Sequence, residues 1–569
     1  MRTQFAFALA ALALLPATAE ASLWEDATST TIGTTAGWSN KIELADIDGD
    51  GDVDILFANG GNYSSAGAPE QNYAFLNQGP GLAFADASDA VFGTTGDLAR
   101  VVKARDIDGD GDLDVLVGAT YQTQSRLFRN DGGGAFTEVT ASNLPQVAAS
   151  VGDLEAGDVD GDGDLDLLVA DWGAGNPGTN GGGRTMLWLN DGAGGFTDVT
   201  AAQMPDVLVR WSWDLELVDV DDDYDLDALV SCKSCTGSVL FRNDGAGTFA
   251  HDSDALPQFA NNYEFEAMDI DSDGDLDLIT VNDGAGLREH VFVNADGSFT
   301  DGTGTLWPTS ENLGSDDNVV AFLDVESDGD ADFVIGSLNG SDRLLENDGS
   351  GRLTVVQDVM TGTATPGTLG LAFADLNGDG KLDAVQGQGE VASADKVFLG
   401  VDIPADTAPP SITRVKALAQ AFAGDTPAIR ARVHDTKSPL ALHDFESVEL
   451  RWSLDGGAEQ TIDMSWYGEY LWRGDLPALA TGELQYRVCA VDAATNQACS
   501  DAVDVTVTEA LDPGPDAGPD FNPDADPGAD SNDGGCGCRL AARTSPSPWA
   551  MLALVALLAI RRRNKRRKE

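Results

Sequence analysis

The chain has 569 residues, and its 95 acidic against 33 basic side chains give a formal net charge of −62 at pH 7. A chain of this length can hold several domains with separate cores. The acidic excess argues against nucleic acid as a partner, because binding to the phosphate backbone depends on clustered Lys and Arg.

Residues 1–21 have the pattern of a signal peptide. Arg2 precedes an apolar run that ends at Leu15, and small residues between Ala17 and Ala21 offer cleavage sites. The alternative is an uncleaved membrane anchor, which the short run does not favour. We therefore expect an exported protein.

Between residues 46 and 383 the chain has seven variants of a nonapeptide of the form D-x-D-G-D-G-D-x-D. Carboxylates at positions 1, 3, 5 and 9, with a backbone carbonyl at position 7, can surround one hard cation, and Gly at position 6 permits the sharp turn. This pattern predicts up to seven bound Ca²⁺ ions. The expected ligand residues are Asp46, Asp48, Asp50, Asp52 and Asp54; Asp106, Asp108, Asp110, Asp112 and Asp114; Asp158, Asp160, Asp162, Asp164 and Asp166; Asp219, Asp221, Asp223, Asp225 and Asp227; Asp269, Asp271, Asp273, Asp275 and Asp277; Asp324, Glu326, Asp328, Asp330 and Asp332; and Asp375, Asn377, Asp379, Lys381 and Asp383.

Comparison among the seven copies favours metal ligation. Positions 1, 5 and 9 are always Asp, and position 3 changes only to Glu326 and Asn377, which keep an oxygen donor. Position 7 becomes Lys381 in the last copy, as a backbone-carbonyl position allows. Tyr224 replaces the position-6 Gly of the fourth copy, so that turn must be strained or different. The alternative is a set of solvated acidic turns. An EF-hand is disfavoured because position 12 never has the bidentate Glu.

The copies start 60, 52, 61, 50, 55 and 51 residues apart, a spacing that suits four-stranded propeller blades. An alternating strand precedes each copy, and a short apolar strand such as residues 54–58 follows it. A further strand such as residues 127–130 ends in turn chemistry, often Asn-Asp-Gly. The chain opens with a lone strand at residues 23–28 and the last unit stops at residues 396–400, so we expect these two to pair and close a ring.

On these repeats, residues 22–400 resemble the FG-GAP/VCBS repeat family and the seven-bladed propeller of integrin alpha-chain heads, in which D-x-D-x-D-G-x-x-D loops bind calcium. The resemblance implies an all-β, seven-bladed propeller with calcium as its metal. It does not identify a ligand or a reaction, because propellers host adhesins, lectins and some lyases.

Residues 406–510 form a second predicted module. Segments such as residues 448–454 and 484–491 alternate apolar and polar side chains, which indicates a β-sandwich similar to immunoglobulin-like or fibronectin type III modules. Its tryptophans Trp452, Trp466 and Trp472 belong either to the core or to a glycan-binding platform.

The six cysteines of an exported chain point to disulfides. Cys489 and Cys499 bracket a predicted hairpin and should be bonded. Cys232 and Cys235 have C-x-x-C spacing between two strands of one unit, and we expect a disulfide that pins the turn; redox or zinc chemistry is the alternative.

Residues 511–535 are rich in Pro, Asp and Gly, which predicts an extended acidic linker. Residues 536–569 combine Cys536 and Cys538, a short apolar helix at 548–560 and a basic end, and resemble the MYXO-CTERM sorting tail. The resemblance implies transient anchoring in the inner membrane, cleavage with Cys536 or Cys538 as the processing residue, and delivery to the cell surface, the outer membrane or the medium. The alternative is a plain inner-membrane anchor.

The sequence shows no catalytic motif, since its four His lack metal-ligand spacing and there is no G-x-S-x-G elbow or phosphate loop. We expect a monomeric, non-enzymatic surface protein that acts in adhesion and binds a glycan or protein through loops on one propeller face. The alternatives are a polysaccharide lyase or other carbohydrate-active enzyme, and a passive structural surface component. Candidate ligand contacts are Tyr63, Trp172, Trp211 and Trp213, with ordinary packing as the alternative for the tryptophans.

Overall fold

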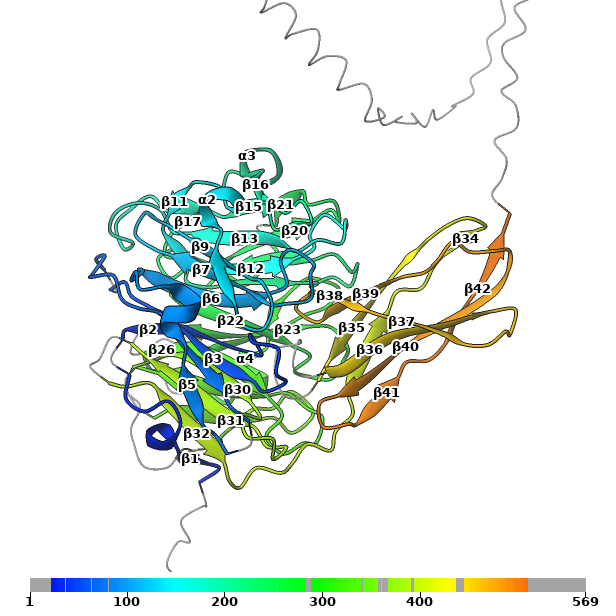
Figure 1. Ribbon diagram of the computed structural model, residues 1–569. Helices are drawn as coiled ribbons and strands as arrows, with labels where there is room; N and C mark the ends of the chain where they lie inside the picture. The colour runs from blue at the N-terminus through cyan, green and yellow to red at the C-terminus, as the bar shows by residue number, and fades with distance from the viewer. Residues whose placement is uncertain are drawn as a thin grey trace, which may run out of the picture. The chain divides into compact units, whose positions relative to one another are not determined.

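The computed structural model describes residues 22–509, except 36, 63, 80, 253, 283–287, 313, 339–340, 357–359, 361–366, 390–392 and 436–444. This part of the chain is all-β, with many small antiparallel sheets and a few short helices (Figure 1). The predicted signal peptide, linker and sorting tail, with Cys536 and Cys538, lie outside the described residues. Within the described residues, no helix has the length and apolar character needed to span a membrane.

Residues 24–400 contain seven four-stranded antiparallel sheets. In chain order the first four consist of β2 (Ser39–Ala45), β3 (Asp54–Asn59), β4 (Tyr73–Asn77) and β5 (Phe84–Asp86); β6 (Ala99–Arg105), β7 (Asp114–Ala119), β9 (Arg126–Asn130) and β10 (Phe136–Glu138); β12 (Val151–Gly157), β13 (Asp166–Asp171), β15 (Met186–Leu189) and β16 (Thr197–Asp198); and β18 (Leu215–Val218), β19 (Asp227–Val230), β20 (Val239–Asn243) and β21 (Phe249–Asp252). The other three consist of β22 (Asn262–Met268), β23 (Asp277–Asn282), β24 (His290–Val293) and β25 (Thr300–Asp301); β26 (Asp317–Leu323), β27 (Asp332–Ser337), β28 (Arg343–Glu346) and β29 (Thr354–Val356); and β30 (Thr368–Ala374), β31 (Asp383–Gln388), β32 (Lys396–Gly400) and β1 (Trp24–Asp26).

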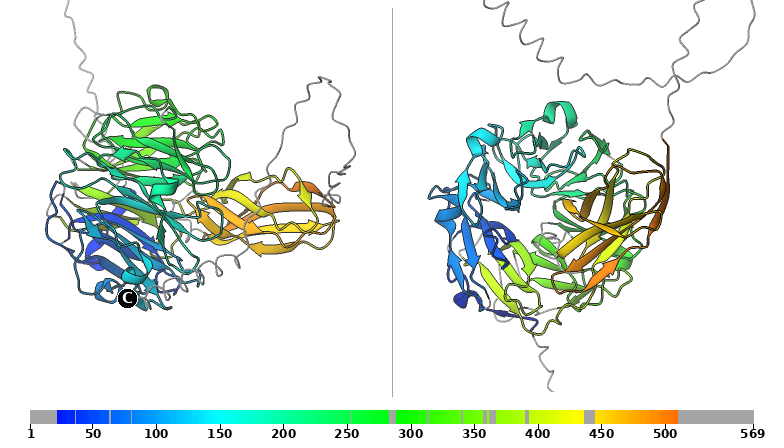
Figure 2. Two further views of the ribbon diagram at one scale, coloured as in Figure 1. Left: turned by 90° about the horizontal axis from the view of Figure 1, so that it is seen from above. Right: turned by 45° about the vertical axis from the view of Figure 1, so that its right-hand side comes forward.

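The first strands of the sheets surround a central axis. Each contacts the first strand of the next sheet, from β2 through β6, β12, β18, β22 and β26 to β30, and β30 contacts β2. The right-hand view of Figure 2 shows the resulting propeller-like ring. Each acidic nonapeptide connects the first and second strands of one sheet. Second strands such as β3 and β7 are buried along their whole length, as their apolar sequences predict.

The N-terminal strand completes the last sheet. β1 pairs antiparallel with β32, with Trp24 opposite Gly400 and Asp26 opposite Phe398. The Trp24 side chain is fully buried, and its Nε1 donates a hydrogen bond to the carbonyl of Leu382 at 2.9 Å. The pairing expected from the lone leading strand is therefore present, and it joins the two ends of the ring.

The remaining elements of the ring are short. Two ribbons extend from its loops, β8 (Thr123–Gln124) paired with β11 (Ala148–Ala149) and β14 (Gly183–Arg184) paired with β17 (Leu208–Val209). The helices are η1 (Thr28–Thr30), α1 (Ser88–Phe92), α2 (Thr140–Asn143), α3 (Thr200–Gln203) and α4 (Thr303–Leu306).

The second module consists of two sheets around one apolar core. Trp452 and Trp472 are buried in this core and Trp466 packs against it, which favours the core interpretation of these tryptophans over a glycan platform. One sheet contains β33 (Ser411–Val415), β35 (Ala428–His434), β39 (Leu471–Asp475) and β38 (Ser465–Gly468). The other contains β34 (Ala421–Phe422), β42 (Val503–Thr508), β40 (Gly482–Asp492), β36 (Phe445–Leu454), β37 (Gln460–Asp463) and β41 (Gln497–Cys499).

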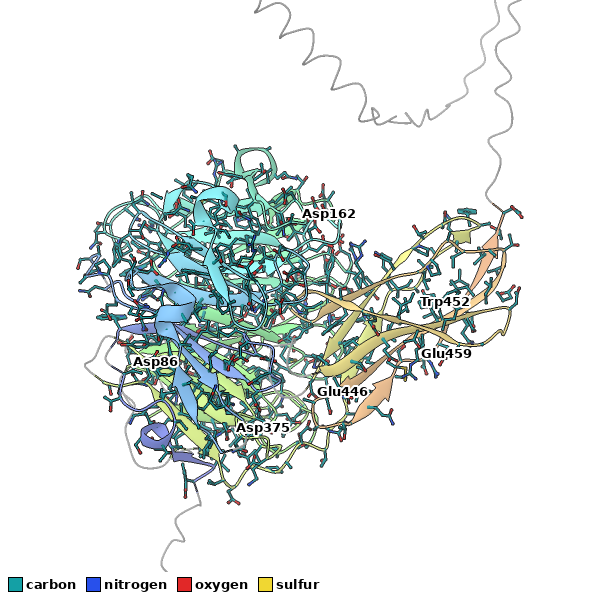
Figure 3. All side chains as sticks on the ribbon, in the orientation of Figure 1. Asp86, Asp162, Asp375, Glu446, Trp452 and Glu459 are labelled. Atoms are coloured by element: carbon teal, nitrogen blue, oxygen red, sulfur yellow. A yellow bond between two sulfur atoms is a disulfide. The ribbon has the colours of Figure 1, made fainter. Side chains whose placement is uncertain are left out.

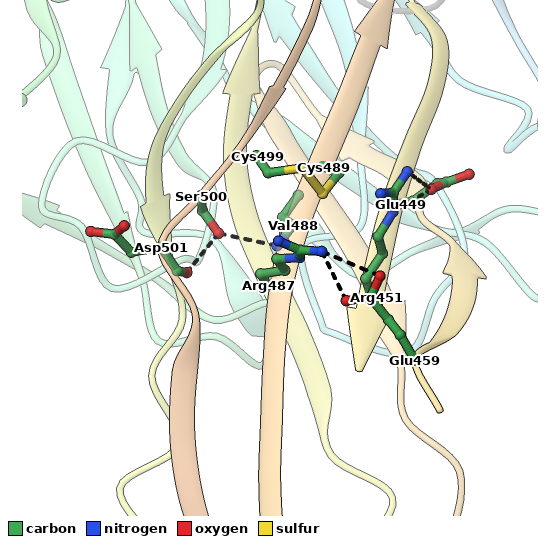
Figure 4. The surroundings of a disulfide bond; sticks show 9 residues. All are labelled: Glu449, Arg451, Glu459, Arg487, Val488, Cys489, Cys499, Ser500 and Asp501. Carbon is green, nitrogen blue, oxygen red and sulfur yellow. Dashed lines mark hydrogen bonds and ion pairs between the residues drawn. A yellow bond between two sulfur atoms is a disulfide. The ribbon is translucent and has the colours of Figure 1, made fainter. Parts of the chain in front are cut away.

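Both expected cysteine pairs are joined in the structure. Cys489 on β40 lies opposite Cys499 on β41, with a Cα–Cα distance of 4.0 Å (Figure 4). Cys232 and Cys235 are bonded across the turn between β19 and β20, with a Cα–Cα distance of 5.5 Å. The second pair therefore pins a turn, as its position between two strands predicts.

Candidate metal centre

Each acidic nonapeptide is a tight loop organised by its first carboxylate. In the first loop, Asp46 accepts hydrogen bonds from the backbone N–H groups of Gly49, Asp50 and Gly51 at 2.8, 3.1 and 2.8 Å. Gly49 and Gly51, at positions 4 and 6, have φ values of 74° and 94°, which glycine adopts without a Cβ penalty. The carboxylate at position 1 therefore folds the loop around itself.

This folding brings the acidic side chains together. Among the described residues, oxygens from three carboxylates lie within 4.8 Å of one another in at least five loops and could hold a metal ion. Figure 3 labels Asp162 of the third loop and Asp375 of the seventh. The converging groups are Asp46, Asp48 and Asp50; Asp106, Asp108 and Asp110; Asp158, Asp160 and Asp166; Asp219, Asp221 and Asp223; and Asp269, Asp271 and Asp273.

In four loops, one oxygen of the position-3 carboxylate is buried without a hydrogen-bond donor in the described part of the chain. Among the described residues, nothing donates a hydrogen bond to the buried Oδ1 atoms of Asp48, Asp108, Asp221 and Asp271. A buried carboxylate oxygen without a partner is costly. Burial, and next the Asp50 carboxylate, raise the pKa of Asp48. Because the same atom lacks a partner at four equivalent positions, the donor set fits a hard metal ion at the centre of these loops.

Position 9 has a second role that the sequence did not reveal. In the first loop, Oδ2 of Asp54 accepts the N–H of Ile47 at 2.9 Å and Oδ1 accepts the N–H of Asn77 at 2.7 Å. Burial raises the pKa of Asp54 to about 8. The equivalent Asp114 makes the same two contacts in the second loop. The predicted position-9 ligand is therefore also the anchor that ties each loop to the third strand of its sheet.

A recurring Asn joins six of the seven sheets to the one before it, and in the seventh sheet Gly400 occupies the equivalent position. The Nδ2 group of Asn130 donates to the carbonyl of Ile47 in the preceding loop at 2.9 Å and to that of Leu113 at 3.2 Å. Asn77 reaches the carbonyl of Leu376 in the last sheet at 2.9 Å, so the same contact crosses the closure of the ring. Asn190, Asn243, Asn294 and Asn347 make the equivalent contacts with Ile107, Val159, Val220 and Ile270.

From the sequence, Asn-Asp-Gly was predicted only to form a turn. The clue to its further role is that the Asn recurs in six units, including two in which Asp-Gly does not follow it, at Asn77 and Asn294.

The fourth loop keeps the common turn despite Tyr224. Tyr224 has a φ of 69°, in the left-handed region that Gly occupies in the other copies, and its N–H donates to Asp219 at 3.1 Å. The loop is thus strained and not rearranged, since a non-Gly residue is disfavoured there. The Oδ1 atoms of Asp219 and Asp221 accept no hydrogen bond from any described residue.

The last two loops keep the same backbone pattern. In the sixth, Asp324 accepts the N–H groups of Asp328 and Gly329 at 3.1 and 2.8 Å. In the seventh, Asp375 accepts the N–H of Gly378 at 2.8 Å. The Lys381 ammonium donates a hydrogen bond to the carbonyl of Val401 at 2.9 Å. Position 7 can therefore offer a metal only its backbone carbonyl oxygen.

Arginines of the second module contact the third, fourth and fifth loops. Arg473 pairs with Asp158 at 3.0 Å, and Arg414 pairs with Asp275 at 2.7 Å. Arg430 pairs with Asp225 and donates to the carbonyl of Tyr224 at 2.8 Å. Burial raises the pKa of Asp158 to about 6, while the Arg473 guanidinium opposes this shift. These contacts join residues far apart in sequence, so no local pattern indicated them.

The predicted ligand-contact tryptophans are mostly packing residues. Trp172 is fully buried and Trp213 is 2% exposed, so the prediction that they contact a ligand at the surface was wrong. Their rings lie 6.2 Å apart, and Trp213 also packs against Trp211 at 5.9 Å. Trp211 is partly buried, and Tyr63 lies outside the described residues. The large apolar surface around each indole drives these side chains into the core.

The comparisons with known proteins agree with the repeat structure. A model of the FG-GAP-like repeat matches residues 106–169 and 324–385, which contain the second, third, sixth and seventh acidic loops. No curated protein matches the chain. Among solved structures, the chain is similar to a puromycin hydrolase at 14% identity and a TM-score of 0.37, over 72% of this chain and 60% of that one. This chain therefore spans less than two thirds of that protein, and so distant a likeness supports no functional argument.

Proposed function

We propose that the chain is an exported, cell-surface protein in which a calcium-stabilised, seven-bladed FG-GAP/VCBS propeller binds a glycan or protein ligand in adhesion. The second module is, on this proposal, an immunoglobulin-like sandwich, and the C-terminal tail anchors the chain only transiently. The observation that carries the proposal is the buried, unpartnered position-3 oxygen repeated in four equivalent loops.

Calcium fits the donor set because it takes six to eight oxygen ligands in flexible geometry. When bound, it supplies the positive charge that the crowded carboxylates lack. The residues of the loop then have distinct tasks: Asp46 at position 1 holds the turn, and Asp48 and Asp50 offer converging oxygens. Asp54 ties the loop to the third strand. Ion binding and ring stability are coupled through this arrangement.

The antiparallel topology separates the metal loops from the proposed ligand face. Connections between first and second strands lie at one edge of every sheet, and connections between second and third strands lie at the other. Arginines of the second module contact three of the metal loops, so the second module covers part of the metal-loop edge. The ribbons β8–β11 and β14–β17 project from the opposite edge. Leu208 on β17 is 56% exposed and is our leading contact candidate on this face.

The FG-GAP-like match favours ligand binding over catalysis, since such repeats suggest an integrin-like role. The test is binding of the purified protein to glycan and protein arrays, with saturating calcium and with excess chelator. We expect calcium-dependent binding that Leu208→Ser weakens. Val401→Ser is the matched control, because Val401 is 40% exposed but lies after β32, at the metal-loop edge.

The same experiment separates the alternatives. Release of products from acidic polysaccharides would support the lyase. The absence of both binding and turnover would support the passive surface component.

A further inference from the structure

A cavity of about 140 Å³ lies at the centre of the ring. Its walls are side chains of the innermost strands β2, β6, β12, β18, β22, β26 and β30, and Glu469 from the turn between β38 and β39 of the second module. The hydroxyl of Tyr470 donates to the carbonyl of Ala267 at 2.8 Å and fixes this turn against the ring. The cavity is separate from the metal loops.

The basic groups around the cavity are already paired. Lys41 forms ion pairs with Asp153 at 2.6 Å and Asp214 at 2.9 Å, and Glu264 lies 3.7 Å away. Lys103 pairs with Glu155, and Arg105 pairs with Glu43. Each cation thus has a carboxylate of its own, and these pairs do not neutralise the rest of the acidic lining.

Three carboxylates remain without a counter-ion. Among the described residues, no basic group forms an ion pair with Glu216, Glu266 or Glu469, and none donates a hydrogen bond to their carboxylates. Glu266 is only 8% exposed, yet it lines the cavity, and Oε2 of Glu216 is buried without a partner. Burial, and next the Glu266 carboxylate, raise the pKa of Glu216 well above its usual value. Three facing carboxyl groups therefore point into one small space.

One wall of the cavity is aliphatic. Val320 on β26, Leu369 and Leu371 on β30, and Ile42 on β2 line it. A calcium ion takes six to eight oxygen donors, which this wall cannot supply. An organic cation satisfies both walls, because its charged head pairs with the carboxylates while its alkyl part contacts the aliphatic side chains. A cavity of about 150 Å³ holds a molecule the size of benzene, so the ligand should have about six non-hydrogen atoms.

We propose that the central cavity binds a small alkylammonium or alkylguanidinium group, with Glu216, Glu266 and Glu469 as its counter-ions. The group could belong to a free amine or to a lysine or arginine side chain of a partner protein. This site lies beyond the proposed surface adhesion and does not depend on metal in the loops.

The proposal is tested by calorimetric titration of the purified, calcium-saturated protein with n-butylammonium, with Nα-acetyl-lysine methylamide, and with neutral n-butanol. We expect one molecule of an ammonium compound to bind to each chain, and we expect n-butanol not to bind. Binding of n-butylammonium without binding of the lysine derivative identifies a free amine as the ligand, whereas binding of the lysine derivative, with or without n-butylammonium, identifies a partner's side chain.

Isosteric variants locate the site. Glu216→Gln and Glu266→Gln should each weaken binding at least tenfold, because each removes one counter-ion. Glu446→Gln, at an exposed residue outside the cavity, should bind as the wild type does. Both cavity variants should melt at or above the wild-type temperature, because each removes one of several mutually repelling carboxylates.

If neither ammonium compound binds, if n-butanol binds equally well, or if both cavity variants keep wild-type affinity, the proposal is wrong. The carboxyl groups would then retain protons instead of binding a cation.

Discussion

The recurring Asn that links neighbouring sheets allows a quantitative test of how the ring is held together. Asn130 is 2% exposed, and its Nδ2 donates to the carbonyls of Ile47 and Leu113 at 2.9 and 3.2 Å. Its Oδ1 accepts the N–H of Gly132 at 3.1 Å. Asn130→Ala removes these hydrogen bonds, each of which contributes about 1 kcal/mol, and leaves the buried carbonyl of Ile47 without its donor. We expect the free energy of unfolding to fall by about 3 kcal/mol.

The assay is urea unfolding followed by tryptophan fluorescence in saturating calcium, with stability taken from the midpoint at constant slope. Asn176→Ala is the matched control, because Asn176 is exposed and lies in a loop; its loss should stay below about 1 kcal/mol. If Asn130→Ala costs no more than the control, the Asn contacts do not hold adjacent sheets together, and the reasoning fails.

Three further predictions test other parts of the structure. Gly111→Ala should lower the stability of the ring by about 1–2 kcal/mol, because Gly111 has a φ of 95°, which is unfavourable for alanine. An added Cβ would meet nothing within 4 Å, so the loss would come from the backbone conformation and not from a clash. The control is Gly304→Ala, at a helical glycine with open space, which should leave the melting temperature unchanged or raise it. Burial lowers the pKa of His434 to about 4 from its usual 6.5, so its contribution to stability is complete above pH 6.5 and is lost as the pH falls toward 4. His434→Gln should therefore lose less stability than the wild type over that pH range in unfolding titrations, and equal losses would contradict the assignment. Removing the disulfide by Cys489→Ala with Cys499→Ala should cost about 2–3 kcal/mol, and a reducing agent should lower the stability of the wild type but not of the variant.

The fold was largely predictable from the sequence because its information is repeated. Seven copies of one loop, each between an alternating and an apolar segment, specify the same strand–loop–strand unit at every occurrence. The pairing of residues 24–26 with β32 also followed, because a lone leading strand has one free partner at the end of the last unit. Local turn chemistry and strand alternation were sufficient for these elements.

The contacts that the sequence did not reveal depend on distances between chain segments. The arginines at 414, 430 and 473 reach loops more than 100 residues away, and nothing in their local sequence indicates a partner. Trp172 resembled a loop contact because it lies in a Gly-rich stretch, but its indole packs against Tyr121 at 5.1 Å. A local pattern distinguishes neither a buried from an exposed Trp nor a paired from an unpaired Arg.

The central cavity, in contrast, left a signal in the repeats. Three residues before each of the first five acidic loops stands a charged residue, and in the last two units the same position is Ala. These charged residues are Glu43, Lys103, Glu155, Glu216 and Glu266. Charged side chains at one repeated position of the innermost strands must face one another across the axis, so comparison of the strands as well as the loops would have found the acidic lining.

The central claim is that metal ions in the acidic loops stabilise the ring. It is tested most directly by calorimetric melting of the purified protein with calcium and with excess chelator, together with a count of bound metal. We predict six or seven calcium ions per chain and a steep fall in melting temperature on chelation, since each site filled at 100 times its Kd contributes about 2.7 kcal/mol. Little bound calcium and an unchanged melting temperature would show that the loops are only acidic turns and would contradict the account.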